Sequence, residues 1–254
     1  MPIILVTNDD GYRSEGITVL AEALRPLGDV TIVAPVEEAS AIGHALTLRR
    51  PLRLEQIGGG VYAVDGTPTD CVNMAVTQIF KRLPDLVVSG INKGWNLGDD
   101  VTYSGTVAGA LEGALLGVPA LAVSLAATRK AYDFSFSAET AATLAAAMFK
   151  KPLPAWTFLN VNLPKGKPKG FRVTVQAKRN HITSIAERHD PKGRPYYWIE
   201  EGQDEWAPHD RSDYQAVRDG YISVTPLHPD LTAHHALSAV EELTGAEAQN
   251  WVIG

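Results

Sequence analysis

The sequence predicts an α/β protein of the three-layer α/β/α, Rossmann-like kind, built on a mostly parallel sheet. Short apolar runs of strand length alternate with amphipathic segments of helix length through the first half of the chain. This alternation is typical of βαβ units with helices on both faces of the sheet. The runs are apolar throughout, as expected of strands covered on both sides. A chain of 254 residues that is 45% hydrophobic can bury one large core.

The first two strands and the helix between them come early in the chain. Ile3–Thr7 is a continuous apolar run that predicts the first strand. The next segment has apolar residues at positions i, i+3, i+4 and i+7, which form one face of a helix. These residues are Ile17, Leu20, Ala21 and Leu24. Val30–Ala34 predicts the second strand, which ends at Pro35.

A hairpin and a capped helix follow. Three glycines at 58–60 predict a turn between two short strands, 52–54 and 61–64. Thr67 is a good N-cap for the next helix, which has a proline and Asp70 in its first turn. The buried face of this helix is predicted to hold Val72, Ala75, Val76, Ile79 and Phe80.

Two further strands flank the next helix. Residues 85–89 predict the third buried strand, and a polar, glycine-rich loop covers 90–103. The helix that follows is capped by Ser104. Its buried face is predicted to hold Val107, Ala110, Leu111, Ala114 and Leu115. Residues 119–125 then predict another strand of the same sheet.

The second half of the chain is less regular. An alanine-rich segment, 137–151, predicts a helix, and the tail from His234 predicts a shorter one. Three strands are predicted at 156–163, 171–177 and 221–226. Residues 179–212 are polar, except for an aromatic cluster of Tyr196, Tyr197 and Trp198. A segment of this length is too long for a simple connection, so we expect it to pack against something.

Composition excludes several classes of protein. The net charge is −6 and no long Lys/Arg run occurs, so a nucleic-acid polymer is not expected as a partner. No apolar run reaches the roughly 18 residues of a membrane span. The only cysteine, Cys71, rules out an intramolecular disulfide and fits a reducing compartment. We therefore expect a cytoplasmic protein that does not bind membranes.

Two consecutive carboxylates follow the first strand, in the sequence Asn8-Asp9-Asp10-Gly11. In a loop that turns at Gly11 the carboxylates can converge, and a divalent cation would relieve their repulsion. Oxygen ligands of this kind suit Mg²⁺ or Mn²⁺ better than zinc. The alternative is that both acids only shape the turn. Their place at the carboxyl end of a strand favours function, because ligands bind there in parallel sheets.

A second polar loop follows the third strand. Asn92 and Asn96 lie among glycines, and their amides could hold a cation or phosphate oxygens. Lys93 could contact phosphate, but the preferred interpretation is a solvated lysine. An ordinary turn-rich loop would look the same.

Two further segments carry weaker signals. Ser104, Gly105 and Thr106 begin a helix, whose free N–H groups could bind phosphate, although capping alone would explain the serine. Ser40 and His44 lie in the loop after the second strand. Each of these motifs alone is weak evidence for function. Together they are stronger evidence, because one pocket at the strand ends could contain all of them.

Taken in order along the chain, these motifs resemble the survival protein E (SurE) family of nucleotidases. The resemblance covers residues 3 to about 230. It rests on Asn8–Gly11, on Ser40 with 43–47, and on 66–72, 89–92, 96–98, 103–107, 196–198 and 220–226.

The resemblance implies a metal-dependent phosphomonoesterase that hydrolyses nucleoside 5′- and 3′-monophosphates, with short polyphosphate as a further substrate. It implies one divalent cation per subunit, Mg²⁺ or Mn²⁺. The implied metal ligands are Asp9, Asp10, Ser40 and Asn92, and the two aspartates are also the catalytic residues. The implied substrate-binding residues are Asn8, Asn96, Ser104, Gly105 and Thr106.

The resemblance also implies a homodimer or homotetramer. Residues 1–130 would form the Rossmann-like core with the active site. Residues 131–254 would complete that core and make the subunit contacts, through an extended hairpin and an exchanged terminal segment. The polar segment 179–212 would then contain the hairpin.

Two positions depart from the family pattern. Trp95 stands where the family has a small residue or proline, so it could reshape contacts with the base or ribose. Val36 stands where an aspartate usually follows the Ala-Pro pair, which affects loop capping and none of the implied ligands.

The implied chemistry is attack on phosphorus by a water that the metal activates. Attack by Asp9 or Asp10 is an alternative, but the Asp-x-Asp-x-Thr pattern of aspartyl-phosphate enzymes is missing. His44 could be the general acid or only a loop residue. Two other functions use the same sequence features: a regulator that binds nucleotide without hydrolysis, and a purely structural oligomer.

Overall fold

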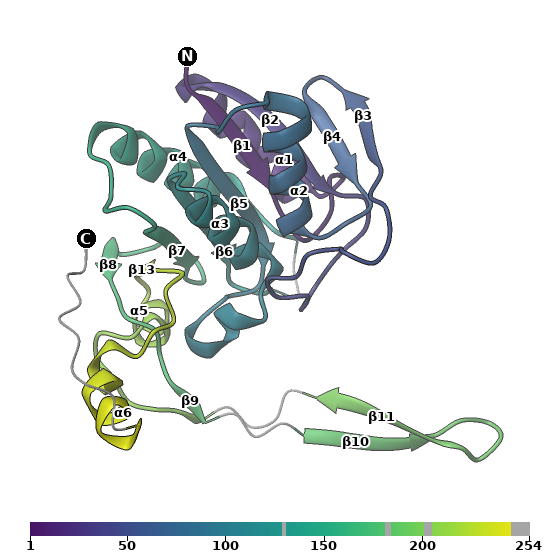
Figure 1. Ribbon diagram of the computed structural model, residues 1–254, viewed down its shortest axis with the longest axis vertical. Coiled ribbons are helices and arrows are strands. Elements are labelled where there is room, and N and C mark those ends of the chain that lie inside the picture. The colour runs from purple at the N-terminus through teal and green to yellow at the C-terminus, as the bar shows by residue number, and fades with distance from the viewer. Residues whose placement is uncertain (129–130, 181–183, 201–204, 245–254) are drawn as a thin grey trace.

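One mixed sheet forms the middle of the molecule in the computed structural model (Figure 1). The structure describes residues 1–128, 131–180, 184–200 and 205–244. Within these ranges nine strands form the main sheet, in the order β3-β4-β2-β1-β5-β6-β7-β13-β8. In that order they are β3 (Leu54–Gly58), β4 (Val61–Val64), β2 (Asp29–Pro35), β1 (Ile3–Thr7), β5 (Leu86–Lys93), β6 (Ala120–Leu125), β7 (Phe158–Leu163), β13 (Ile222–Leu227) and β8 (Phe171–Val173).

The sheet is mostly parallel, as the sequence predicted. The strands from β4 to β7 all pair in parallel. The exceptions are β3, which is antiparallel to β4, and β13, which is antiparallel to β7. The carboxyl ends of the parallel strands therefore meet at one edge, where ligands bind in open sheets of this class.

Helices cover both faces of the sheet and complete three layers (Figure 1). The helices α1 (Glu15–Leu24) and α4 (Ser135–Lys150) pack on one face, and α2 (Pro68–Met74) and α3 (Gly105–Leu115) pack on the other. Side chains alternate along β1, so Ile4 and Val6 contact the α1 side while Leu5 contacts the α2 side. Each such buried side chain stabilises the fold by ~2 kcal/mol.

The predicted cap of α2 is confirmed. The Thr67 hydroxyl accepts the N–H of Asp70, and the Asp70 carboxylate accepts the N–H of Thr67, so two unpaired donors are satisfied together. After Met74 the chain continues as a π-helical segment, η2 (Ala75–Phe80). Ala75 is buried in that segment, and Ile79 and Phe80 pack against the α2-side core.

The helix α3 begins as predicted, because the Ser104 hydroxyl accepts the N–H of Val107 (3.1 Å). Its buried face differs from the prediction at one position. Leu115 is 48% exposed, in the last turn of the helix, while Glu112 is buried. The apolar pattern could not show this, because Glu112 is buried through polar partners and not through apolar contacts.

The strand β5 is longer than predicted and includes Gly90 to Lys93, which the sequence had placed in a loop. At Gly90 the backbone has φ 143°, and a side-chain Cβ would lie 2.5 Å from the carbonyl oxygen of Val123. Glycine therefore lets β5 stay paired with β6 at a point where another residue would clash. As a result, Asn92 is on a strand end and not in a free loop.

Other boundaries shifted by a few residues. The first strand of the early hairpin is β3, at 54–58 and not 52–54. The strand β7 starts at Phe158, which leaves Trp156 outside it, and β8 ends at Val173 rather than 177. The helix α5 (Asp213–Arg218) was not predicted, because six residues are too few for a clear helical pattern.

The C-terminal part holds a separate hairpin of β10 (Ser184–His189) and β11 (Pro195–Glu200), which stands away from the main sheet (Figure 1). A short antiparallel pair, β9 (Arg179–Asn180) and β12 (Glu205–Trp206), lies between this hairpin and the body. The predicted tail helix is α6 (Leu237–Thr244), after the short turn η4 (His234–Ala236). The remaining short helices are η1 (Arg25–Leu27) and η3 (Gly98–Thr102).

The described ranges contain no helix with the length and hydropathy needed to cross a bilayer.

Candidate active site

A cavity of about 500 Å³ opens where the loops after β1, β2 and β5 meet. Most of its lining comes from the motifs that the sequence singled out, and the segment just before α3 closes one side. The lining residues are Asp9, Asp10, Glu38, Ser40, Ala41, Asn92, Lys93, Trp95, Asn96, Asp100, Tyr103 and Ser104.

Asp9 is held in place by the start of α3. Asp9 is 5% exposed, and the Thr106 hydroxyl donates a hydrogen bond to one of its carboxylate oxygens. Gly105 makes the close approach possible, since a Cβ there would lie 2.8 Å from the Cβ of Asp9. Burial raises the pKa of Asp9, and hydrogen bonds from the side chain and backbone of Thr106 oppose that rise.

Asp10 is the less satisfied of the two acids. Its Oδ2 atom is buried and has no hydrogen-bond partner. Burial and the neighbouring charge of Asp9 raise the pKa of Asp10 to about 6, while Lys93 acts in the opposite direction. An unpartnered carboxylate oxygen beside a second carboxylate is an arrangement that a bound cation would stabilise.

Two neutral oxygen donors face the same cavity. Ser40 is exposed and its hydroxyl donates to Glu38 (2.6 Å). The Asn92 amide nitrogen donates to the carbonyl of Gly94 (3.0 Å), which turns its nitrogen away and leaves the amide oxygen available as a ligand.

Asn96 is fixed by polar side chains from two neighbouring strands. Its amide nitrogen donates to the Ser124 hydroxyl of β6 (2.8 Å), and its backbone N–H donates to Asn162 of β7 (2.8 Å). Asn160 and Asn162 both donate to the Asn96 carbonyl, at 2.8 and 3.0 Å. The sequence analysis missed these buried partners. Two asparagines spaced i, i+2 in an apolar strand were the available signal, because they share a face and need hydrogen bonds.

Three of the predicted substrate-binding residues lie behind the cavity and not in its lining. Asn8 is buried, and its amide nitrogen donates to the Gly11 carbonyl (3.0 Å) and the Ser14 hydroxyl (2.8 Å). Gly105 and Thr106 pack against Asp9. In this arrangement the three residues shape the loop and the aspartate.

Charge in the lining is unbalanced. Four carboxyl groups face the cavity against one ammonium group, that of Lys93. The sequence analysis did not select Glu38 or Asp100, because they belong to separate loops that only the fold brings together. An anionic substrate entering this cavity needs added positive charge.

Trp95 forms part of the cavity wall. Its indole N–H donates to the carbonyl of Leu163 (2.6 Å), so the ring has a fixed orientation. Tyr103, 63% exposed, lines the same cavity. The site thus combines acidic and amide groups with two aromatic side chains.

These residues belong to a known family. A family model described as Survival protein SurE matches residues 4–183. The chain belongs to the SurE family. It is 50% identical over 242 residues to a protein of Geotalea daltonii named 5′-nucleotidase SurE, covering 94% of this chain and 98% of that one. It is also 50% identical over 247 residues to the protein of the same name from Geobacter metallireducens, covering 96% and 98%.

The SurE fold is confirmed by a solved structure. The crystal structure of the SurE protein from Aquifex aeolicus matches with a TM-score of 0.85 and 43% sequence identity, covering 96% of this chain and 100% of that one. The mostly parallel sheet with helices on both sides is therefore the SurE architecture.

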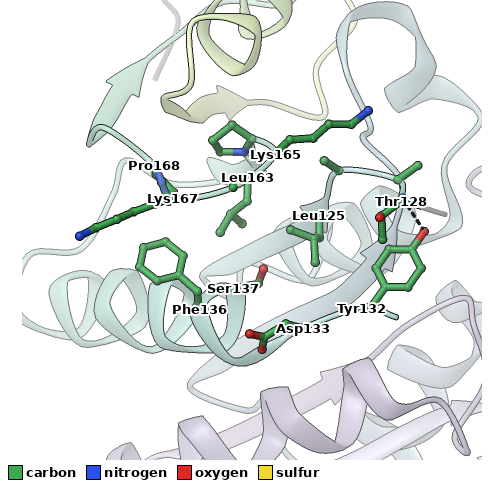
Figure 2. A pocket seen from close by; sticks show the side chains of 14 residues that line it. Leu125, Thr128, Tyr132, Asp133, Phe136, Ser137, Leu163, Lys165, Lys167 and Pro168 are labelled. Atoms are coloured by element: carbon green, nitrogen blue, oxygen red, sulfur yellow. Dashed lines mark hydrogen bonds between the residues drawn. The ribbon is translucent and has the colours of Figure 1, made fainter. Parts of the chain in front are cut away.

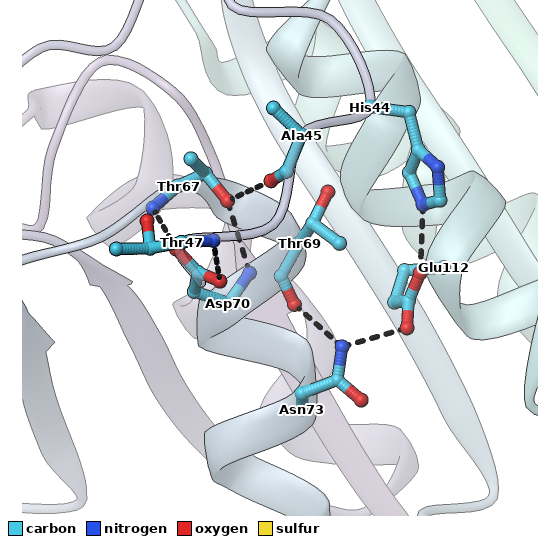
Figure 3. Close-up of polar contacts among 8 residues, drawn as sticks. All are labelled: His44, Ala45, Thr47, Thr67, Thr69, Asp70, Asn73 and Glu112. Carbon is cyan, nitrogen blue, oxygen red and sulfur yellow. Dashed lines mark hydrogen bonds and ion pairs between the residues drawn. The ribbon is translucent and has the colours of Figure 1, made fainter. Parts of the chain in front are cut away.

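His44 does not lie in the lining of this SurE cavity. Its Nε2 atom is 2.7 Å from a carboxylate oxygen of the buried Glu112, whose other oxygen accepts from Asn73 (2.7 Å) (Figure 3). Figure 3 also shows the Thr47 N–H bound to Asp70 (3.0 Å). These contacts tie the loop that carries Ser40 to α2 and α3, so His44 has a structural contact here and not the position of a general acid.

The C-terminal part of the SurE chain also reaches this site. Asp213, at the start of α5, is fully buried and accepts the backbone N–H of Gly98 (2.8 Å) and of Ala177 (3.0 Å). Burial raises the pKa of Asp213, and these backbone hydrogen bonds oppose it. The loop that contains Asn96 is therefore anchored by the far end of the chain.

The residues present fit a divalent cation. The buried, unpartnered Oδ2 of Asp10, the adjacent Asp9, and the oxygens of Ser40 and Asn92 are hard donors of the type that Mg²⁺ and Mn²⁺ take. In the described part of the chain no three His, Cys, Asp or Glu side chains gather as a metal group. A cation here would thus use two carboxylates together with hydroxyl and amide oxygens.

Proposed function

We propose that this SurE protein is a divalent-cation-dependent phosphomonoesterase that hydrolyses nucleoside 5′- and 3′-monophosphates, and also short polyphosphate. The observation that carries the proposal is the unpartnered Asp10 oxygen beside Asp9 in a cavity with four carboxyl groups and one ammonium. Such a cavity repels phosphate unless a cation is bound. The name 5′-nucleotidase, carried by relatives of about half-identical sequence, supports the choice of substrate.

The cation would be held by Asp9, Asp10, Ser40 and Asn92, with Mg²⁺ or Mn²⁺ as the expected ions. When bound, it would supply concentrated positive charge against the phosphoryl oxygens. Asp9 is kept in position for this by Thr106 and Gly105. The raised pKa of Asp10 means that its charged form needs a cation more than an ordinary surface aspartate does.

Phosphate positioning would fall to the amide and hydroxyl groups that line the cavity. Asn96 is locked by Ser124 and Asn162, so its side chain is preorganised and costs little entropy to order. Lys93 and Ser104 line the same cavity and would add a charge and a hydroxyl. The nucleoside would contact Trp95 and Tyr103, whose rings can pack against a base.

The experiment is a phosphate-release assay on the purified chain. Nucleoside 5′- and 3′-monophosphates, glycerol phosphate and short polyphosphate are compared before chelation, after chelation, and after adding back Mn²⁺ or Mg²⁺. We expect release that chelation abolishes and the metal restores, with nucleoside monophosphates preferred over glycerol phosphate. Nucleotide binding without release in any arm would identify a non-hydrolytic regulator and overturn the proposal.

We also propose that the chain forms a homodimer or homotetramer through residues 131–254. The support is the hairpin β10–β11, on which Tyr197, Trp198 and Ile199 are 60%, 58% and 79% exposed. A two-stranded hairpin on its own is marginally stable in water, so packing against a second copy would stabilise it. Residues 1–130, with the cavity, would keep their chemistry within each subunit.

A further inference from the structure

A second and larger cavity, of about 1020 Å³, lies at the same carboxyl edge of the sheet (Figure 2). It is bounded by the ends of β6 and β7, at Leu125 and Leu163, and by the start of α4. Its size is in the range of cavities that hold small organic ligands. None of the proposed phosphate or cation residues lines it.

A buried polar group points to a ligand in this cavity. Ser137, in the first turn of α4, is 1% exposed, and its hydroxyl has no hydrogen-bond partner. Figure 2 shows that hydroxyl directed into the pocket. A buried hydroxyl without a partner is costly, and a polar atom of a ligand would satisfy it.

Most of the remaining wall of the cavity is apolar or aromatic. Figure 2 shows the rings of Phe136 and Tyr132 at opposite ends, with Leu125, Leu163 and the Ser137 hydroxyl between them. The Phe136 ring is 46% exposed, an unfavourable position that a bound apolar group would cover. Such walls select a ligand with a flat, largely apolar body.

The charged side chains of the lining bear on the sign of the ligand's charge. Lys165 and Lys167 line the cavity on the segment after β7, and within the described residues neither is paired with a carboxylate. The one acid in the lining, Asp133, already accepts the backbone N–H of Ser135 (3.0 Å) at the start of α4. Two lysines against one aspartate in the lining therefore favour an anion, in contrast to the acidic lining of the first cavity.

The two cavities share a wall. The carbonyl of Leu125 accepts the N–H of Gly94 (2.8 Å), and the carbonyl of Leu163 accepts the indole N–H of Trp95 (2.6 Å). Ser124 and Asn162, which hold Asn96, directly precede these two leucines. A ligand that contacts Leu125 and Leu163 is thus one residue away from the groups that position the active-site loop.

We infer that this cavity is a second ligand site, for an aromatic organic anion. We also infer that a ligand bound there changes the environment of the Trp95 indole. Nucleotides belong to this chemical class, as do aromatic carboxylates and sulfonates. Binding at this site does not depend on the proposed phosphatase activity.

The test uses anilinonaphthalene sulfonate, an aromatic anion whose fluorescence reports binding, on the full chain. We expect saturable binding that Phe136→Ala weakens by about 5- to 10-fold, since half of an aromatic contact is lost. Phe171→Ala is the matched control, because Phe171 is 50% exposed but lies outside the cavity. Replacing Lys165 and Lys167 together with alanine should weaken binding of the dye by roughly 2- to 5-fold.

A second readout locates the dye. The protein has five tryptophans, and Trp95→Phe identifies the Trp95 indole signal in a nitrogen–proton NMR spectrum. That signal should shift on titration in the wild type and stay in place in Phe136→Ala. Asp9→Asn should bind the dye normally, which separates this site from the catalytic one. No saturable binding, or equal losses in Phe136→Ala and Phe171→Ala, would overturn the inference.

Discussion

The acidic cavity and the β10–β11 hairpin both differ from the usual pattern, in which apolar side chains are buried and polar side chains are exposed, but they differ in opposite ways. In the cavity, polar groups are buried: Asp9 is 5% exposed and Asn96 7% exposed. In the hairpin, apolar groups are exposed: Ile199 is 79% and Tyr197 60% in solvent. Each departure costs stability unless a partner offsets it.

The difference shows what kind of partner each region needs. The cavity is small, charged and held by hydrogen bonds from strands, a helix and Asp213, so a small charged ligand suits it. The hairpin is long and paired mainly with itself, and its apolar side chains need a surface of protein size. If this comparison holds, changes in one region should leave the property of the other unchanged.

The largest effect is expected from Asp9→Asn. This change keeps the size of the side chain but removes its charge, so we expect phosphate release to fall by at least about 100-fold with saturating Mn²⁺. The oligomer mass should stay as in the wild type. The control is Asp29→Asn, an exposed aspartate at the start of β2, on the opposite edge of the sheet. Near-wild-type kcat/KM in Asp9→Asn would show that Asp9 only shapes the turn and does not bind the metal.

A smaller effect is expected at Trp95. Trp95→Ala removes a ring from the cavity wall, and we expect KM for purine nucleoside monophosphates to rise by about 5- to 10-fold. The kcat/KM for glycerol phosphate should change by less than about 2-fold, because that substrate has no base. Trp95→Phe keeps a ring without the N–H bonded to Leu163 and should lie in between. An equal loss on both substrates would show that Trp95 supports the loop and not the base.

The role of the hairpin in subunit contacts is tested by measuring the mass of the oligomer. Replacing Tyr197, Trp198 and Ile199 together with serine should lower the mass seen by light scattering by about a factor of two or more, because the exposed apolar surface is lost. Leu231→Ser is the control, since Leu231 is 93% exposed but lies outside the hairpin. An unchanged mass, or a wild type that is already monomeric, would contradict subunit contacts through this hairpin.

The smallest effect is on stability and depends on pH. The pKa of Asp10 is raised to about 6 from an ordinary 3.8, so the native chain binds this proton more tightly than the unfolded chain. The protonated Asp10 carboxyl group therefore stabilises the folded chain at low pH, and this stabilisation is lost as pH rises through about 6. In chelator, Asp10→Asn should raise Tm by roughly 2–4 °C near pH 8 and by almost nothing near pH 4. An equal rise in Tm at pH 4 and at pH 8 would show that the raised pKa of Asp10 is not its cause.

The sequence predicted the architecture well where a residue's role is set by local pattern. The spacing of Ile17, Leu20 and Leu24 identified one face of α1, and all three are buried. The Thr67 and Ser104 caps were readable for the same reason, since a helix start needs a side-chain acceptor. The nearness of Asp9 and Asn92 followed from the rule that parallel strands end at one edge.

What the sequence did not show depends on partners far along the chain. Asn160 and Asn162 support Asn96 across 64 and 66 residues, and Asp213 holds Gly98 across 115. The hydrogen bond from Thr106 to Asp9 spans 97 residues. Continuation of β5 through Gly90 likewise depends on the neighbouring strand at Val123. Such contacts are created by the topology. A local pattern, such as the two asparagines of β7, can show that a buried polar side chain needs a partner, but it does not show which residue the partner is.

The most direct test of the central claim is to titrate Mn²⁺ into the metal-free chain and measure binding by calorimetry. We predict saturation at about one ion per chain in the wild type and in Asp29→Asn, and an affinity at least about 10-fold weaker in Asp9→Asn and in Asp10→Asn, because each removes one of the two negative ligands. Equal Mn²⁺ affinity in all four proteins, or no binding by the wild type, would show that the adjacent carboxylates of Asp9 and Asp10 are not a cation site.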